Sequence, residues 1–103
     1  MYDYRGTVTN DETWTETFAL ETDEDISAWS FECVIADASC VRATATASVD
    51  TVEKEVAFTV ARTSMESLSA DKYTLAARYT DGDGVTVQFI KGSLSVQEGG
   101  FTP

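Results

Sequence analysis

The stretch YTLAARYTDGDGVTVQFIKGSLSV, residues 73–96, decides the fold class of this chain. Its apolar side chains recur at every second residue, which is the period of a β-strand with one buried face. Asp81–Gly84 divides the stretch into two strands, because glycine and short acidic residues accept the positive φ of tight turns. Gly92 lies inside the second strand, where we expect a bulge or a bend. The sequence therefore predicts a β-hairpin that ends in a long strand.

Earlier parts of the chain repeat the period of two. Trp29 to Ile35 and Val56 to Val60 have clear apolar faces, whereas Trp14 to Leu20 carries Glu16 in its apolar register. The run Val41 to Val49 alternates small or apolar side chains with polar ones, which predicts one closely packed or edge strand. The side chains that we expect to point into the core are Trp29, Phe31, Ile35, Phe58, Val60, Leu75, Val87 and Phe89.

A single helical turn is predicted in the connection between two strands. Thr63 and Glu66 have the spacing of a capping box, and Met65 and Leu68 are three residues apart. Near the start of the chain, Tyr2, Tyr4 and Val8 could form a short edge strand. The pattern predicts an all-β fold, an antiparallel β-sandwich of about six or seven strands with one short helical turn. We expect one domain over residues 1–103, with its core at about 13–97.

Charge and composition argue against several classes of function. The chain has 103 residues, with 18 Asp and Glu against 7 Lys and Arg, so it should repel nucleic acid and anionic membrane surfaces. No apolar run approaches the ~20 residues of a membrane-spanning helix. Histidine is absent, which removes Ser-His-Asp and Cys-His catalysis and the commonest transition-metal ligand. We therefore expect no enzyme, no cofactor and no bound metal.

The two cysteines are not expected to bond to each other. Cys33 is in register with the apolar residues of its strand, whereas Cys40 is in register with Arg42 and Thr44. Simple alternation then places the two sulfur atoms on opposite faces of a sheet.

Acidic loops and aromatic residues leave a ligand-binding alternative open. Glu21 to Asp25 and Asp81 to Gly84 could offer oxygen atoms to calcium, but neither continues into a twelve-residue calcium loop, and ordinary turns are expected. Trp14 could form a stacking platform for a carbohydrate because Glu16 shares its register, whereas Trp29 is expected to anchor the core. The alternative is a small module that binds carbohydrate or calcium.

Candidate contact residues come from two parts of the chain. Tyr2, Tyr4 and Trp14 are the aromatic residues that we expect at an interface. The run Val41 to Val49 carries only one charge to discourage the addition of a foreign strand at a sheet edge. Its candidate contact residues are Arg42, Thr44 and Thr46.

Several landmarks between residues 13 and 97 resemble a family of small phage and prophage proteins. Asp25-Ile26-Ser27-Ala28-Trp29 is similar to that family's Asp-Leu-Thr-Gly-aromatic entry to the second strand. Leu68 to Tyr73 resembles its Leu-x-x-Gly-x-Tyr corner, with Asp71 where glycine is common. Asp81 to Gly84, followed by Gly92 and Val96, resembles its hairpin and closing strand, while Thr7 to Glu12 resemble an insertion. The family is related to the N-terminal domain of upper baseplate, or tail adaptor, proteins.

This resemblance implies an immunoglobulin-like sandwich with a structural or adaptor role in a bacteriophage or prophage tail, and it implies no reaction. The expected partners are further copies of the chain, other tail proteins, or both. We expect the protein in the bacterial cytoplasm during assembly and then in the virion tail.

Overall fold

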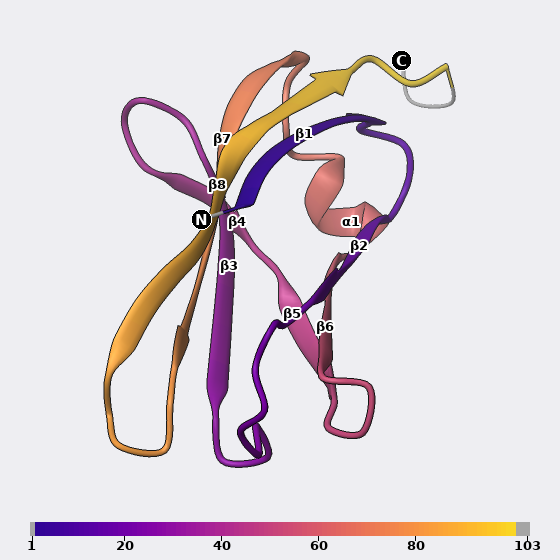
Figure 1. Ribbon diagram of the computed structural model, residues 1–103. Helices are drawn as coiled ribbons and strands as arrows, with labels where there is room; N and C mark the ends of the chain where they lie inside the picture. The colour runs from indigo at the N-terminus through magenta and orange to yellow at the C-terminus, as the bar shows by residue number, and fades with distance from the viewer. Residues whose placement is uncertain (1, 101–103) are drawn as a thin grey trace.

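The chain folds into two facing β-sheets, as the sequence predicts (Figure 1). The computed structural model describes residues 2–100. One sheet has five strands in the order β1-β8-β7-β3-β4, and the other has three in the order β2-β6-β5. The elements are β1 (Tyr2–Thr9), β2 (Trp14–Ala19), β3 (Ser30–Ala36), β4 (Val41–Thr44), β5 (Thr46–Asp50), β6 (Glu55–Val60), α1 (Arg62–Met65), β7 (Asp71–Thr80) and β8 (Thr86–Gln97).

The N-terminal residues form a full edge strand, and its direction differs from the expected antiparallel arrangement. β1 runs parallel to β8, from Tyr2 beside Ile90 to Thr9 beside Gln97, whereas the other strand pairs are antiparallel. Gly92 lies opposite Tyr4, and a Cβ atom at Gly92 would overlap the backbone of Tyr4. The glycine therefore permits the close approach of β1.

The irregularity expected at Gly92 occurs three residues earlier. Ala77 pairs with Ile90 and Arg78 pairs with Gln88, so Phe89 is the additional residue of a β-bulge. The prediction of the long closing strand is correct, because β8 continues through the bulge to Gln97. The hairpin is also as expected: the N–H of Gly84 donates to the Asp81 carbonyl, and Gly84 has φ +84°.

The run from Val41 to Val49 is not one strand. It divides into β4 in the five-stranded sheet and β5 in the three-stranded sheet, and Ala45 lies between them. The N–H of Ala45 donates to the Cys33 carbonyl at 2.9 Å, so the chain leaves the first sheet only after this residue. Period-two alternation continues through such a crossing, which explains why the sequence suggested a single strand.

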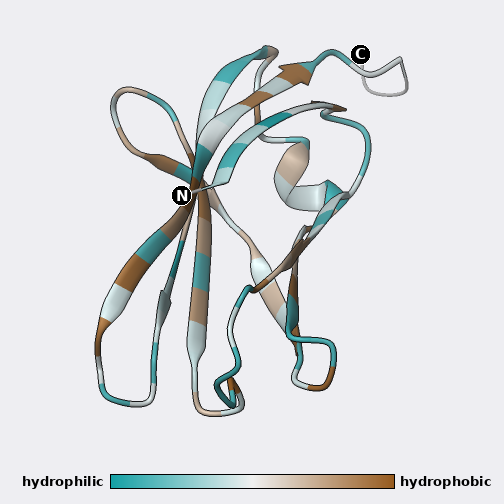
Figure 2. Cartoon of the chain, viewed as in Figure 1, coloured by the Kyte–Doolittle hydropathy of each residue, from teal (hydrophilic) through white to brown (hydrophobic). Residues whose placement is uncertain are grey.

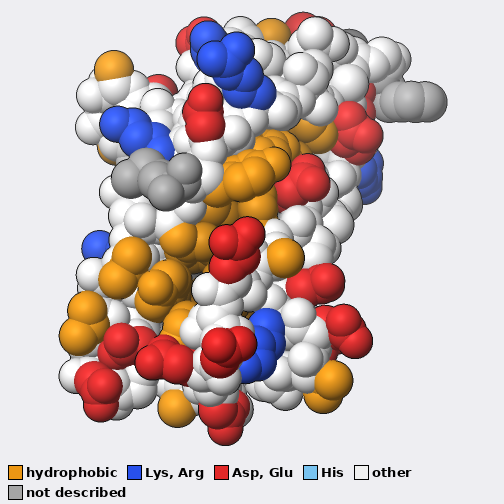
Figure 3. All heavy atoms as spheres, viewed as in Figure 1, with side chains coloured by type: hydrophobic (Ala, Val, Ile, Leu, Met, Phe, Trp, Pro, Cys, Tyr) orange, Lys and Arg blue, Asp and Glu red, His pale blue; other side chains and the backbone are white. Residues whose placement is uncertain are grey.

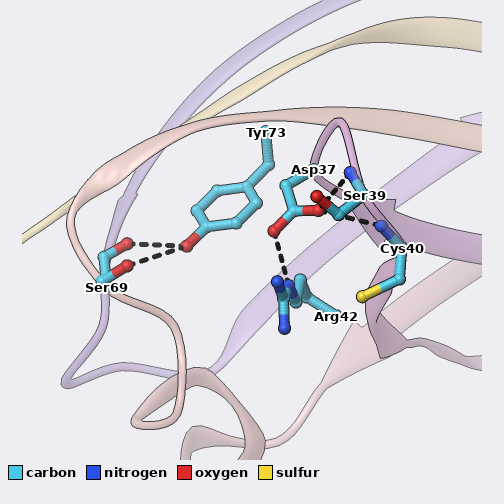
Figure 4. Close-up of polar contacts among 6 residues, drawn as sticks. All are labelled: Asp37, Ser39, Cys40, Arg42, Ser69 and Tyr73. Carbon is cyan, nitrogen blue, oxygen red and sulfur yellow. Dashed lines mark hydrogen bonds and ion pairs between the residues drawn. The ribbon is translucent and has the colours of Figure 1, made fainter.

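The helical turn occurs where it was expected, but the predicted capping box does not form. Ala61 is the N-cap of α1 and gives no side-chain cap, so Thr63 lies inside the turn. Met65 and Leu68 are both buried and anchor the crossover to the core. After the crossover, the Tyr73 hydroxyl donates to the Ser69 carbonyl at 2.9 Å and fixes the entry to β7 (Figure 4).

The core lies between the sheets and contains most of the predicted residues. Apolar and polar segments alternate along β3 and β8 in Figure 2, as required for strands with one buried face. Of the predicted set, Ile35, Phe58, Val60 and Leu75 are at most 1% exposed, and Phe31 and Phe89 pack partly buried against them. Trp29 is only half-buried, and Val87 is 38% exposed, so the prediction of Val87 as a core residue is wrong. No helix among residues 2–100 has the length and apolarity needed to span a membrane.

Candidate functional site

A groove with both apolar and polar lining residues lies between β2 and the first part of β8, where the two sheets leave a side of the sandwich open. Its volume is about 530 Å³. Apolar side chains fill the centre and lower left of Figure 3, and acidic side chains lie along the lower and right borders. The lining residues are Tyr2, Ala19, Leu20, Glu21, Thr22, Glu24, Trp29, Tyr79, Val87, Gln88 and Phe89.

The strand pairing explains why the groove is open. β1 covers β8 only from Ile90 to Gln97, so within residues 2–100 no strand lies beside Thr86–Phe89 on that side. Val87 pairs with Tyr79 and shares its face, but no strand of the smaller sheet covers it. The register predicted for Val87 is therefore sound, and the side chain is exposed because the opposite layer ends before reaching it.

The rings of Trp29, Tyr79 and Phe89 form one wall of the groove, and Phe31 packs against all three. Trp29 stacks on Tyr79 with ring centroids 4.6 Å apart and planes inclined by 14°. Phe89 lies 5.5 Å from Tyr79 and 6.2 Å from Phe31. These rings come from the β2–β3 loop, β3, β7 and the β8 bulge, so residues distant in sequence meet here. Offset aromatic pairs of this kind fix ring positions and keep a broad apolar surface in place.

Tyr2 also lines the groove. It is the candidate contact residue that the structure places at this site, and it is 58% exposed. Its ring lies edge-on to Phe18 at 5.6 Å, so one part is anchored while the remainder faces solvent. Tyr79 and Val87 were not foreseen as site residues. The only signal for them in the sequence is that the apolar faces of the two hairpin strands continue up to the turn.

The acidic rim belongs to the loop between β2 and β3. Glu21 and Glu24 line the groove, and the Glu24 carbonyl accepts a hydrogen bond from Lys54 Nζ at 2.7 Å. Asp25 Oδ1 accepts from the Ser27 N–H at 3.0 Å, and this hydrogen bond lowers the pKa of Asp25. The loop is thus held in place, and it gives the lower rim a negative charge.

Two of the predicted contact residues, Tyr4 and Trp14, are core residues. They are 7% and 4% exposed, and Trp14 Nε1 donates to the Tyr4 hydroxyl at 3.3 Å. The Tyr4 hydroxyl in turn donates to Glu16 Oε2 at 3.4 Å, and burial raises the pKa of Tyr4. Glu16 occupies the apolar register because it accepts this hydrogen bond. Trp14 therefore cannot form a stacking platform for a ligand.

Arg42, Thr44 and Thr46 are exposed, but they lie on the opposite side of the sandwich from the groove. They belong to β4 and β5, which end their sheets at the edges remote from β1 and β2. Arg42 Nε donates to Asp37 Oδ2, so its charge is engaged within its own hairpin (Figure 4). The structure therefore does not bring the six predicted contact residues together.

Asp37 organises the loop that precedes Arg42. Its Oδ1 atom accepts from the N–H groups of Cys40 and Ser39 at 2.9 and 2.8 Å. The Cys40 hydrogen bond, the Arg42 guanidinium and the Ser39 hydrogen bond together lower the pKa of Asp37 to about 2. This ion pair stabilises a turn and leaves neither group free for a ligand.

The described part of the chain has few side chains placed for metal binding or catalysis. Residues 2–100 contain no group of three or more Cys, Asp or Glu side chains placed to hold a metal ion. In the Asp81–Gly84 turn, Asp81 Oδ1 accepts hydrogen bonds from the N–H groups of Asp83 and Val85.

Both cysteines are free: Cys40 is exposed, and burial raises the pKa of the Cys33 thiol to about 12. A thiol with such a pKa is not a nucleophile at neutral pH.

Comparison with known proteins supports the fold and no particular activity. No protein-family model matches the chain, and no curated protein matches it in sequence. Among solved structures, the chain is similar to a candidate glycoside hydrolase from Bacteroides vulgatus ATCC 8482, with a TM-score of 0.63 and 12% identity. The match covers 94% of this chain and 17% of the hydrolase chain. The likeness therefore shows a shared fold only.

Proposed function

We propose that this chain is a non-enzymatic structural or adaptor component of a bacteriophage or prophage tail, of the baseplate type, that acts through protein–protein contacts. The observation that carries the proposal is the open groove between β2 and β8, with its aromatic wall and acidic rim. Exposed large apolar side chains that gather at one site, rimmed by polar residues, are typical of protein contact surfaces. Tyr2 and Val87 are such side chains.

The local structure is consistent with the family resemblance. The residues that resemble the family's corner contain Tyr73, which bonds the backbone four residues upstream at the start of β7. A tyrosine that hydrogen-bonds the backbone in this way is a feature of immunoglobulin-type sandwiches. We therefore propose that the sandwich is immunoglobulin-like. The Asp81–Gly84 hairpin and the long β8 also follow the order of the family's landmarks.

The groove has a surface suited to binding, but its two acidic side chains are not placed for catalysis. Its carboxylates, Glu21 and Glu24, are exposed on a loop at the rim. Carboxylates that act in catalysis lie in sites that exclude water, and these two groups are exposed. Contact without reaction is therefore the function that this arrangement favours.

Proposed partners and location follow from the same role. The partners are other tail proteins at the groove, and further copies of the chain at the edges of β4 and β5. The net charge of −11 disfavours nucleic acid and anionic membranes as partners. The protein would occupy the bacterial cytoplasm during assembly and then the virion tail.

Incorporation into tail particles tests the proposal. Val87→Lys places a charge in the groove, and Val52→Lys adds the same charge at an 84% exposed position in the β5–β6 turn. Mass spectrometry of particles purified from the source bacterium should find the wild-type chain and Val52→Lys, with little Val87→Lys. Absence of the wild-type chain from the particles would refute the tail assignment, and equal incorporation of the two variants would refute the role of the groove.

A second candidate function is carbohydrate binding at the same groove. It is favoured by the exposed ring of Tyr2 and the half-buried ring of Trp29 beside Glu21 and Glu24, since sugars stack on aromatic faces and donate hydroxyl hydrogen bonds to carboxylates. Calorimetric titration with neutral oligosaccharides, repeated with Trp29→Ala, tests it. The calcium alternative gains no support, because Asp25 and Asp81 accept hydrogen bonds from their own loops.

A further inference from the structure

The outer face of the five-stranded sheet carries most of the basic residues of this acidic chain. Four of the seven Lys and Arg residues lie on it, at exposed positions that alternate with buried ones, but only two of the 18 Asp and Glu residues do. The remainder of the chain therefore has sixteen acidic residues and three basic ones. The charged residues of this face are Arg5, Lys72, Arg78 and Lys91 with Asp3 and Glu32.

Three of these four cations have no acidic partner in the described part of the chain. Arg78 pairs with Glu32 at 3.1 Å. Arg5, Lys72 and Lys91 form no ion pair with any of residues 2–100. They lie on the neighbouring strands β1, β7 and β8, which are about 5 Å apart, so their charges repel one another. Carboxylates of another molecule would relieve this repulsion.

A hollow of about 440 Å³ lies beside these charges on the same face. Its apolar lining includes Val34, Val41 and Ala76, and Ala76 is directly opposite Lys91 on the neighbouring strand. The surface is depressed here because the side chains in the middle of the sheet are small. The hollow therefore suits an apolar side chain that projects from an acidic segment.

The chain itself has such a segment in the hairpin between β7 and β8. Asp81 and Asp83 lie in the turn, and Val85, which follows them, is 55% exposed. No Lys or Arg occurs between Tyr79 and Ile90, whereas the acidic β5–β6 turn contains Lys54. The hairpin forms the lower left corner of the molecule in Figure 1, where it can reach another molecule.

A copy cannot place this hairpin in its own hollow. Both belong to the same two strands, and the turn begins five residues after Ala76, which is about 17 Å at about 3.3 Å per residue. The contact must therefore join two copies, and it uses a different surface of each.

The net charge of −11 opposes this contact only at long range. At about 0.15 M salt the Debye length is about 8 Å, so charges outside the contact are largely screened. Opposite charges that meet within the contact still attract, and they fix its register.

We propose that the β7–β8 hairpin of one copy binds to the basic outer face of a second copy, with Val85 in the hollow and Asp83 beside Lys91. Repetition of this head-to-tail contact gives a closed ring or an open filament, depending on the rotation between copies. The inference rests on the protein-contact function proposed above. It names a surface for contact between copies in addition to the edges of β4 and β5.

Charge reversal on the two sides of the contact tests the proposal. In sedimentation equilibrium at 0.15 M salt, Lys91→Glu and Asp83→Lys should each weaken self-association at least fivefold. A chain with both changes keeps the net charge of −11 and should associate within twofold of the wild type, because the two charges are exchanged. A wild type that stays monomeric at about 1 mM, or a double variant no better than the single ones, would overturn the proposal.

Glu53→Lys separates local contact from the effect of net charge. It makes the same charge change as Asp83→Lys, but at an exposed position in the β5–β6 turn. Repulsion between net charges predicts stronger association for both variants. The proposed contact predicts weaker association for Asp83→Lys and no weakening for Glu53→Lys. Equal behaviour of the two variants would refute the contact.

Crosslinking between isotopically distinct copies locates the contact. A photoreactive benzoylphenylalanine replaces Val85 in chains with natural nitrogen, and these are mixed with wild-type chains labelled with ¹⁵N. Mixed-isotope crosslinks should join position 85 to Val34, Ala76 or their neighbours on β3 and β7. Crosslinks to β5, or only within one chain, would contradict the proposed location.

The two proposals can fail separately. If the purified chain stays monomeric but is incorporated into tail particles, the tail assignment stands and this inference is wrong. If the chain associates through the hairpin but is absent from tail particles, only the tail assignment falls.

Discussion

Gly92→Ala should destabilise the domain far more than a single added methyl group would on an open strand. The Cβ atom would overlap the N, C and O atoms of Tyr4, which are all backbone atoms. No side-chain rotation can relieve that overlap, so β1 must move away from β8. Forced overpacking typically costs about 1 to 3 kcal/mol, and we expect the upper end, about 3 kcal/mol. Displacement of β1 would also expose Tyr4 and Val8, at about 2 kcal/mol for each buried side chain.

Urea denaturation monitored by tryptophan fluorescence measures this effect. Trp14 is a suitable probe because its Nε1 atom bonds the Tyr4 hydroxyl and therefore reports the position of β1. Gly100→Ala is the matched control, since no atom of residues 2–100 lies within 4 Å of a Cβ atom there. Stability of Gly92→Ala within about 0.5 kcal/mol of the wild type would refute the register of β1 against β8.

Further predictions concern the corner, the Asp37 loop and the cysteines. Tyr73→Phe removes the hydrogen bond to Ser69 and should lower the free energy of unfolding by about 1 kcal/mol, measured in urea; no change would contradict a stabilising corner. The lowered pKa of Asp37 contributes stability above about pH 4 that is lost as pH falls through about 2. Asp37→Asn should therefore lower the urea midpoint at pH 6 and lower it much less near pH 2, and equal losses at both would exclude this linkage. Cys40 should react with a thiol reagent in the native state and Cys33 only after unfolding; rapid native labelling of both would contradict the burial of Cys33.

Most strands could be predicted from the sequence because alternation reports directly on a face that is buried along its whole length. The hairpin at Asp81–Gly84 and the buried faces around Ile35, Phe58 and Leu75 are of this kind. Alternation does not reveal which sheet a residue belongs to. For that reason the alternation from Val41 to Val49 predicts one strand, although the chain changes sheets at Ala45.

The candidate site was harder to predict because it depends on where the opposing layer ends. Val87 and Trp29 lie on apolar faces that local pattern assigns to the core, and only the short extent of the smaller sheet leaves them accessible. Conversely, Trp14 was predicted to make contacts because Glu16 broke the apolar register, and Tyr4 because it lies near the start of the chain. In the structure, the hydrogen bond from Tyr4 accommodates Glu16 at the border of the core. A charged residue in an apolar register thus marked a hydrogen-bond acceptor for a buried hydroxyl.

The central claim is that this domain acts by contact through the groove, and site-specific crosslinking in assembled particles tests it most directly. A photoreactive benzoylphenylalanine is placed at position 87 in one sample and at position 52 in another, and crosslinked peptides from purified tail particles are identified by mass spectrometry. Position 87 should crosslink to another tail protein, and position 52 should give no such product. Crosslinks that form equally from both positions, or only from position 52, would contradict the account.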